Sequence, residues 1–160
     1  QVLVGRTLHR SMLLGLVLAG LSPVWLRPEI DAATGLPLGV TPAAVADGFR
    51  RAPKAVAVLL GEPSYVGTVA DVDGTADIAH ARGVPLVIDA AWAAHFGFHP
   101  DLPPHALQQG ADALVTSAHK AFPAWSQAAL ILARGERIDL ARLDACVEAT
   151  ATTSPAALAS

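Results

Sequence analysis

The sequence is poor in lysine, cysteine and aromatic residues. Only Lys54 and Lys120 among its 11 basic residues are lysines, and Cys146 is its single cysteine. One cysteine cannot form an internal disulfide, which favours a reducing compartment, and the cytoplasm is the expected location. The net charge is −3 at pH 7, and no basic cluster exceeds the pair Arg50-Arg51. This charge pattern argues against nucleic acid as a partner.

Long apolar runs are also missing. The longest uncharged run near the start covers residues 11–26 and contains Pro23. A membrane-spanning helix needs about 20 apolar residues, so we predict a buried helix followed by a strand, and no membrane contact. The 160 residues are 52% hydrophobic, which suits one domain with a sizeable core. Because the chain opens on Gln1 in a strand-like run, we expect a fragment of a longer polypeptide.

Short apolar runs alternate with helix-like segments along the chain. This alternation is typical of an α/β fold with a mostly parallel sheet and helices on both faces. The predicted strands are Val2–Val4, Pro23–Leu26, Ala55–Leu60, Pro85–Asp89, Ala113–Thr116 and Ala128–Ala133. The predicted helices are His9–Ala19, Thr41–Arg51, Gly74–Arg82 and Leu140–Ala149.

Chemically active side chains follow two of the predicted strands. Asp89 ends one strand, and Ser117, His119 and Lys120 follow the next strand along the chain. In open α/β sheets ligands bind at the carboxyl ends of the strands. We therefore expect Asp89 and Lys120 to face one cavity.

Two interpretations of Asp89 and Lys120 are open. The simpler one is a structural ion pair, or an aspartate that caps the following turn. The other uses both groups on one ligand, because a lysine amine forms a Schiff base with an aldehyde and a carboxylate pairs with a protonated pyridine nitrogen. Pyridoxal phosphate requires both of these partners.

Four segments resemble a known family. The stretch from Asp89 to Leu132, together with "VLVGRTLHRS", "GEPSYVG" and "TTSP", is similar to the ornithine/lysine/arginine decarboxylases. Members of that family are fold-type-I pyridoxal phosphate enzymes related to aspartate aminotransferase. The resemblance covers essentially the whole chain and implies part of the large cofactor-binding domain, an aspartate-aminotransferase-like α/β domain.

The resemblance implies a role for seven residues. Lys120 would carry the Schiff base, and Asp89 would pair with the pyridinium nitrogen. Ala91 would lie against the ring and Trp92 beside its phenolic oxygen, although Ala90 replaces the glutamate that many members have. The remaining roles fall to Ser117 and His119 at the phosphate and to His9, which would stack on the ring opposite the lysine.

The resemblance also sets expectations for the rest of the enzyme. The reaction would be decarboxylation of lysine, arginine or ornithine, whereas an aminotransferase, another lyase or a non-catalytic cofactor-binding paralogue remain alternatives. We expect the family's upstream phosphate-binding turn and its small C-terminal domain to lie outside this stretch, which should then be inactive alone. The family's sites lie at a dimer interface, and Thr152–Pro155 would reach the neighbouring subunit's cofactor.

Other candidate residues receive weaker interpretations. Ser64 and Tyr65, in the loop after a strand, are expected to line the pocket. His95, His99 and His105 could suggest a metal site, but Gly97 and Pro100 interrupt a helix there and no third ligand is evident. We predict no metal and treat His95 as a pocket or loop residue.

Overall fold

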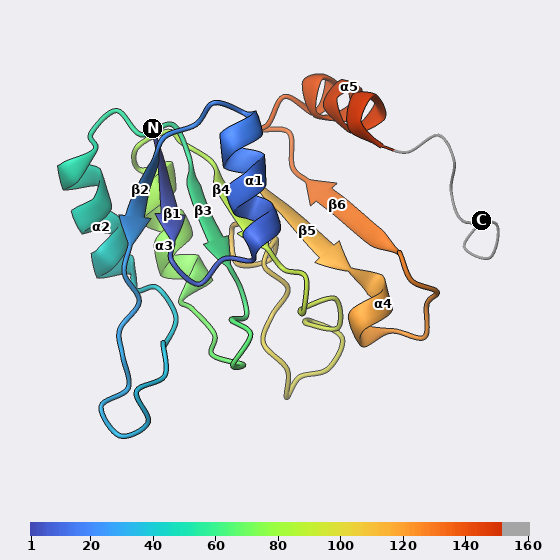
Figure 1. Ribbon diagram of the computed structural model, residues 1–160, viewed down its shortest axis with the longest axis horizontal. Helices are drawn as coiled ribbons and strands as arrows, with labels where there is room; N and C mark the ends of the chain where they lie inside the picture. The colour runs from blue at the N-terminus through green and yellow to red at the C-terminus, as the bar shows by residue number, and fades with distance from the viewer. Residues whose placement is uncertain (152–160) are drawn as a thin grey trace.

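The computed structural model describes residues 1–151, which fold around a single sheet (Figure 1). The strands lie in the order β2-β1-β3-β4-β5-β6, and only β6 runs antiparallel to its neighbour. Their bounds are β1 (Val2–Gly5), β2 (Pro23–Leu26), β3 (Val58–Gly61), β4 (Leu86–Asp89), β5 (Ala113–Ser117) and β6 (Ala129–Ala133). The predicted mostly parallel α/β fold is confirmed.

Helices cover both faces of the sheet. The helices within residues 1–151 are α1 (Arg10–Leu18), α2 (Pro42–Arg51), α3 (Val72–His80), α4 (Ala118–Ala121) and α5 (Leu140–Thr150), of which α1, α2 and α3 contribute buried residues to the core. In Figure 1, α1 lies in front of the sheet and α3 behind it. The predicted arrangement of helices on both faces is therefore confirmed.

Alternating side chains of the strands supply a core to each face. Leu3 packs with Phe49 of α2 and Ala76 of α3 in the larger cluster of buried residues. Its neighbour Val4 points to the opposite face, where it packs with Leu16 of α1. Successive residues of a strand point to opposite faces, so β1 contributes to both cores.

Several helix ends follow directly from capping residues. Thr41 accepts a hydrogen bond from Ala44 N and Pro42 opens α2, as its sequence predicts. α3 begins at Val72 rather than Gly74, because the carboxylate of Asp71 accepts the Gly74 amide hydrogen at 2.9 Å. α1 begins at Arg10, and the predicted first residue, His9, is its N-cap.

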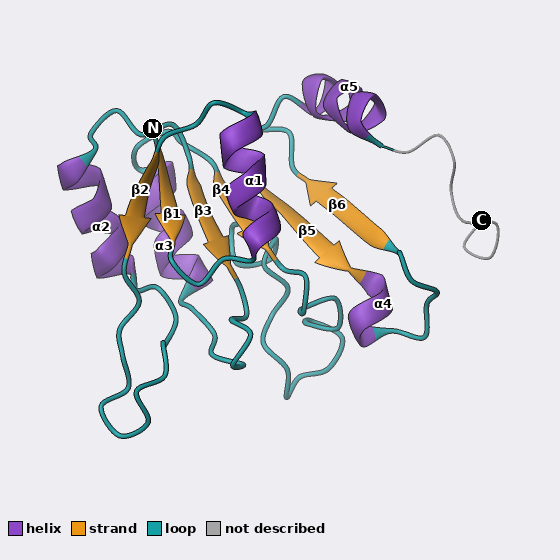
Figure 2. Cartoon of the chain, in the orientation of Figure 1, coloured by secondary structure: helices purple, strands orange, loops and turns teal. Residues whose placement is uncertain are grey.

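The long connections gather at the carboxyl edge of the parallel strands (Figure 2). The segments after β1, β2, β3 and β4 all leave the sheet there, and α4 follows β5 at the same edge.

At the opposite edge, buried Asp112 accepts hydrogen bonds from Leu86 N at 2.8 Å and from Arg137 Nη1 at 3.2 Å. His80 Nε2 of α3 lies 2.9 Å from the same carboxylate, so Asp112 ties these segments together.

None of the helices within residues 1–151 combines the length and apolar character that crossing a membrane requires.

Candidate active site

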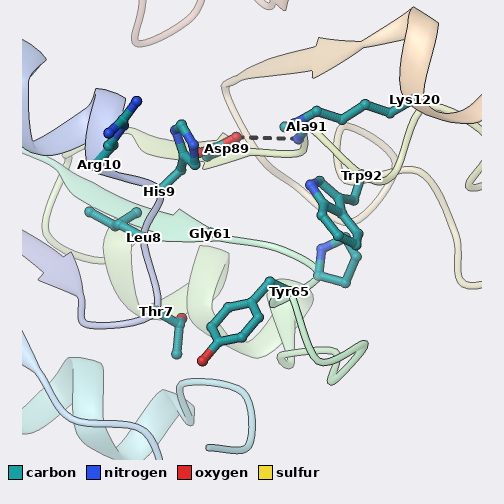
Figure 3. Close-up of a pocket in the computed structure, with 11 residues that line it drawn as sticks. Thr7, Leu8, His9, Arg10, Gly61, Tyr65, Asp89, Ala91, Trp92 and Lys120 are labelled. Carbon is teal, nitrogen blue, oxygen red and sulfur yellow. Dashed lines mark hydrogen bonds between the residues drawn. The ribbon is translucent and has the colours of Figure 1, made fainter.

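A cavity of about 310 Å³ lies at the carboxyl edge of the sheet (Figure 3). The residues that line it lie at or after the ends of four neighbouring strands. The lining residues are Thr7, Leu8, His9 and Arg10 after β1, Gly61, Pro63 and Tyr65 at and after β3, Asp89, Ala91 and Trp92 at and after β4, and Lys120 on α4 after β5. Five of the seven residues that the sequence predicts for the site thus meet in one cavity.

Asp89 is the last residue of β4 and is 9% exposed. Its Oδ1 accepts the amide hydrogen of Ala91 at 3.2 Å, the bond drawn in Figure 3. No cation within residues 1–151 forms an ion pair with it. Asp89 therefore caps the following turn with one oxygen, Oδ1. The carboxylate can still accept a hydrogen bond from a further donor, which a buried charge requires.

Lys120 is exposed on the four-residue helix α4. Its Nζ lies 5.8 Å from the ring centroid of Trp92, whose side chain is itself 53% exposed. This cation–π contact is worth about 0.5–1 kcal/mol at an exposed site. The structural ion pair between Asp89 and Lys120 is not formed, and the amine is free to turn into the cavity.

His9 reaches the cavity from the start of α1. Its Nδ1 lies 2.8 Å from Ser11 Oγ and 3.3 Å from Ser11 N, so one ring nitrogen caps the helix. The other ring nitrogen has no hydrogen-bond partner within the described residues. Figure 3 shows the imidazole beside Asp89, with Arg10 next to it. Capping fixes the ring at the cavity wall without using its faces.

Ser117 and His119 do not line this cavity, in contrast to the other predicted residues. Ser117 ends β5, and its hydroxyl makes no capping hydrogen bond to α4. His119 Nδ1 lies 2.8 Å from the carbonyl oxygen of Ala128 and 3.1 Å from its amide nitrogen. The ring therefore holds the start of β6, and Nε2 is the nitrogen left for another partner.

The secondary candidates separate in the structure. Tyr65 lines the cavity, whereas Ser64 is buried and its Oγ lies 2.6 Å from Thr68 Oγ1, so the expectation for Ser64 is wrong. His95 lines a neighbouring cavity that shares Trp92 and Lys120 with the first. Within residues 1–151 no three His, Cys, Asp or Glu side chains are grouped as metal ligands would be. The Thr152–Pro155 segment lies outside the described residues.

Two further residues, Thr116 and Gly61, shape the site although no role was predicted for them. Thr116 Oγ1 donates to the carbonyl of Ala90 at 2.8 Å and so fixes the backbone next to Asp89. Gly61 forms part of the wall, where a Cβ would lie 3.2 Å from the carbonyl oxygen of Thr7. In the sequence, only their positions could have indicated these roles: Thr116 is a polar residue near the end of β5, and Gly61 is a glycine at the end of β3.

Glu62 is a buried acid directly behind the wall. It is 4% exposed, and its Oε1 has no hydrogen-bond partner among residues 1–151. Burial raises the pKa of Glu62 to about 7, although a hydrogen bond from the Ala70 backbone opposes this shift. Its amide nitrogen donates to the carbonyl oxygen of Asp89 at 2.9 Å, so the backbones of the two acids are joined.

The residues present fit pyridoxal phosphate. Asp89 offers a buried carboxylate without a described cation, as a protonated ring nitrogen requires, and Lys120 offers a free amine on the same cavity. The Ser117 hydroxyl and His119 Nε2 are further polar groups at the end of β5, and neither has a hydrogen-bond partner among the described residues. A divalent metal would instead need several carboxylate, thiolate or imidazole ligands around one point.

Comparison with known proteins adds a family match. Residues 1–159 match the family described as Orn/Lys/Arg decarboxylase, major domain. The arginine decarboxylase of Halalkalibacterium halodurans is 32% identical over 154 residues, which are 96% of this chain and 31% of that protein. The arginine decarboxylase of Bacillus cereus is 29% identical over 96% of this chain and 34% of its own length. The chain thus spans about a third of these curated relatives.

Solved structures share the fold at lower identity. Mouse CSAD in its apo form is 20% identical, with a TM-score of 0.67 over 99% of this chain and 33% of that chain. Apo CalE6, a methionine gamma lyase from Micromonospora echinospora, is 21% identical, with a TM-score of 0.64 over 99% of this chain and 39% of that chain. These likenesses show the fold.

Proposed function

The chain belongs to the Orn/Lys/Arg decarboxylase family, and from this membership and the cavity's geometry we propose that it forms part of a pyridoxal phosphate dependent amino-acid decarboxylase. The substrate would be a basic amino acid, namely arginine, lysine or ornithine, and the products an amine and carbon dioxide. Relatives named arginine decarboxylase at about 30% identity support this choice.

The observation that carries the proposal is the meeting of Asp89 and Lys120 at one cavity. The two residues come from neighbouring strands, since β4 and β5 pair in parallel with Asp89 opposite Val115. A buried carboxylate and an amine with no ion-pair partner within residues 1–151 line one cavity, and they match the two ends of a pyridine aldehyde. When bound, pyridoxal phosphate would supply the electron sink for the bond broken at the substrate's carboxyl group.

Each residue has a defined task in this proposal. Lys120 would hold the cofactor's aldehyde through Nζ, and the same Nζ, at the cavity wall, would be placed to donate a proton to the substrate. The Asp89 carboxylate would keep a proton on the ring nitrogen, because a negative partner favours the charged form of a base. Ala91, Trp92 and His9 would contact the ring.

The phosphate would lie toward the end of β5. Ser117 Oγ and His119 Nε2 would donate to it, since neither atom has a described partner. Charge-assisted hydrogen bonds of this kind are about twice as strong as neutral ones. Both residues lie outside the lined cavity, so the cofactor would extend from the cavity toward α4.

A homodimer is part of the proposal. Leu14, Val17 and Leu18 of α1 are 62%, 75% and 89% exposed, an apolar surface that is costly to leave in water. A second copy would cover it. Sedimentation equilibrium of the full-length protein should therefore give a dimer or a multiple of one, and a charged replacement at Leu18 should shift it toward monomer.

Product analysis tests the reaction directly. The full-length protein, saturated with cofactor, should convert at least one of arginine, lysine and ornithine into the corresponding amine, with one carbon dioxide released per amine. Formation of a keto acid in place of the amine would identify an aminotransferase and reject the proposal. Absence of any product with all three substrates would also reject it.

A further inference from the structure

A second cavity adjoins the candidate active site and contains cations and hydroxyls without an acid. This cavity, here called the arginine cavity, has a volume of about 500 Å³. Arg6, Arg27, Thr7 and Tyr65 line it together with Ile30 and two prolines. Thr7 and Tyr65 also line the candidate active site, so the two cavities share a wall.

The two arginines leave the sheet side by side. β1 and β2 pair in parallel with Gly5 opposite Leu26, and Arg6 N donates to the carbonyl oxygen of Leu26 at 3.1 Å. Arg6 and Arg27 are the next residues of the two strands. Both side chains are exposed, so water and salt screen the repulsion between these like charges, and an anion bound between them would offset what remains.

No acid within residues 1–151 neutralises the pair, since neither guanidinium forms an ion pair there. The nearest acids along the chain are Glu29 and Asp31. The carboxylate of Asp31 is engaged by Thr34, whose hydroxyl and backbone amide both donate to it. Glu29 is exposed, and its carboxylate makes no described hydrogen bond or ion pair, although its backbone carbonyl oxygen accepts from Leu38 N at 2.8 Å.

We propose that the arginine cavity binds an oxyanion, a carboxylate or a phosphate group, between Arg6 and Arg27. A guanidinium presents a planar fork of donors that matches both groups. The hydroxyls of Thr7 and Tyr65 are further donors, and Figure 3 shows the Tyr65 hydroxyl turned toward Thr7. The source is either the carboxylate of the amino-acid substrate or the phosphate of a separate molecule. The site itself rests on the arginine pair and not on the proposed reaction.

Binding is tested with inorganic phosphate on the full-length protein saturated with cofactor. Phosphate replaces chloride at constant ionic strength, and the unfolding midpoint is followed, because a ligand of the native state raises it. Arg6→Gln and Arg27→Gln should each raise at least tenfold the phosphate concentration that is needed for the same increase in unfolding midpoint. Arg134→Gln, an exposed arginine that lines neither cavity, is the matched control and should bind phosphate like the wild type.

The sign of the stability change provides an independent test. In buffer without oxyanions, Arg6→Gln and Arg27→Gln should raise the unfolding midpoint, because each relieves the repulsion. A lowered midpoint would show that an acidic side chain from another part of the protein fills the cavity, and it would overturn the proposal. A wild-type midpoint that does not respond to phosphate would overturn it as well.

Kinetics then identify the source of the anion. If it is the substrate, phosphate will compete with the amino acid, and Arg27→Gln will raise KM at least tenfold without weakening inhibition by the amine product, which lacks the carboxylate. If it is a separate phosphorylated molecule, phosphate will bind without competing and KM will stay unchanged. The phosphate-binding measurement can be made even if the protein has no decarboxylase activity. Failure of the proposed function and failure of this site are therefore distinguishable.

Discussion

Replacing Glu62 by Gln should make the protein more stable at neutral and alkaline pH. Glu62 is buried, and its Oε1 lacks a hydrogen-bond partner in the described part of the chain, so its ionised form is poorly solvated. Burial raises its pKa from the ordinary 4.5 to about 7. One pKa unit corresponds to about 1.4 kcal/mol, so the full difference amounts to about 3 kcal/mol.

The sign of the effect follows from proton binding. Between pH 4.5 and about 7 the folded protein retains a proton on Glu62 that the unfolded chain has already released, so stability falls as the pH rises through this window. Above about pH 7 the wild-type protein has lost the full amount of stability. Below pH 4.5 both states are protonated, and the variant gains nothing. Glutamine keeps the shape of the protonated acid and an acceptor for the Ala70 amide.

The assay is denaturant unfolding of wild type and variant from pH 4 to 9. Glu62→Gln should be more stable by about 3 kcal/mol above pH 7 and equal to the wild type near pH 4. Glu148→Gln changes an exposed glutamate on α5 and is the matched control, with no expected pH-dependent gain. A Glu62→Gln curve parallel to the wild type over the whole range would refute the argument.

Two further predictions concern the acids at the two ends of the sheet. Burial alone would raise the pKa of Asp112, but hydrogen bonds from Leu86, His80 and Arg137 together lower it, so Asp112→Asn should cost about 2–4 kcal/mol in chemical unfolding at pH 7. This loss should shrink as the pH falls through the lowered folded-state pKa, and an unchanged loss at low pH would contradict the assignment. Asp89→Asn should leave unfolding nearly unchanged but lower kcat about a hundredfold or more, because the electrostatic partner of the ring nitrogen is lost. Steady-state turnover at saturating cofactor measures this, and wild-type turnover would contradict the role.

Strand ends were the most predictable part of the site. Apolar residues run directly into Asp89, and a second apolar run leads to Lys120, so the meeting of both at one edge follows from parallel pairing alone. Loop residues were not predictable in the same way. Arg10, Thr7 and Gly61 reach the cavity through the paths of connecting segments, which hydrophobic periodicity does not encode.

Element boundaries differed where a single side chain or a very short element decides them. The Asp71 cap moves the start of α3 two residues upstream of the predicted Gly74. The helix α4 has only four residues, too few for a periodic pattern, and was not predicted. β3 starts at Val58 instead of Ala55 and extends through Gly61, where its ladder to β4 ends opposite Asp89.

The central claim is that Lys120 holds pyridoxal phosphate, and chemical trapping tests it most directly. The full-length protein with bound cofactor is reduced with borohydride and digested, and the modified peptide is located by mass spectrometry. We expect the cofactor on Lys120, no trapped cofactor in Lys120→Ala, and normal trapping in Lys54→Ala, which replaces the chain's other lysine, far from the cavity in the turn before β3. Cofactor trapped on Lys54, or trapped as efficiently in Lys120→Ala as in the wild type, would contradict the account.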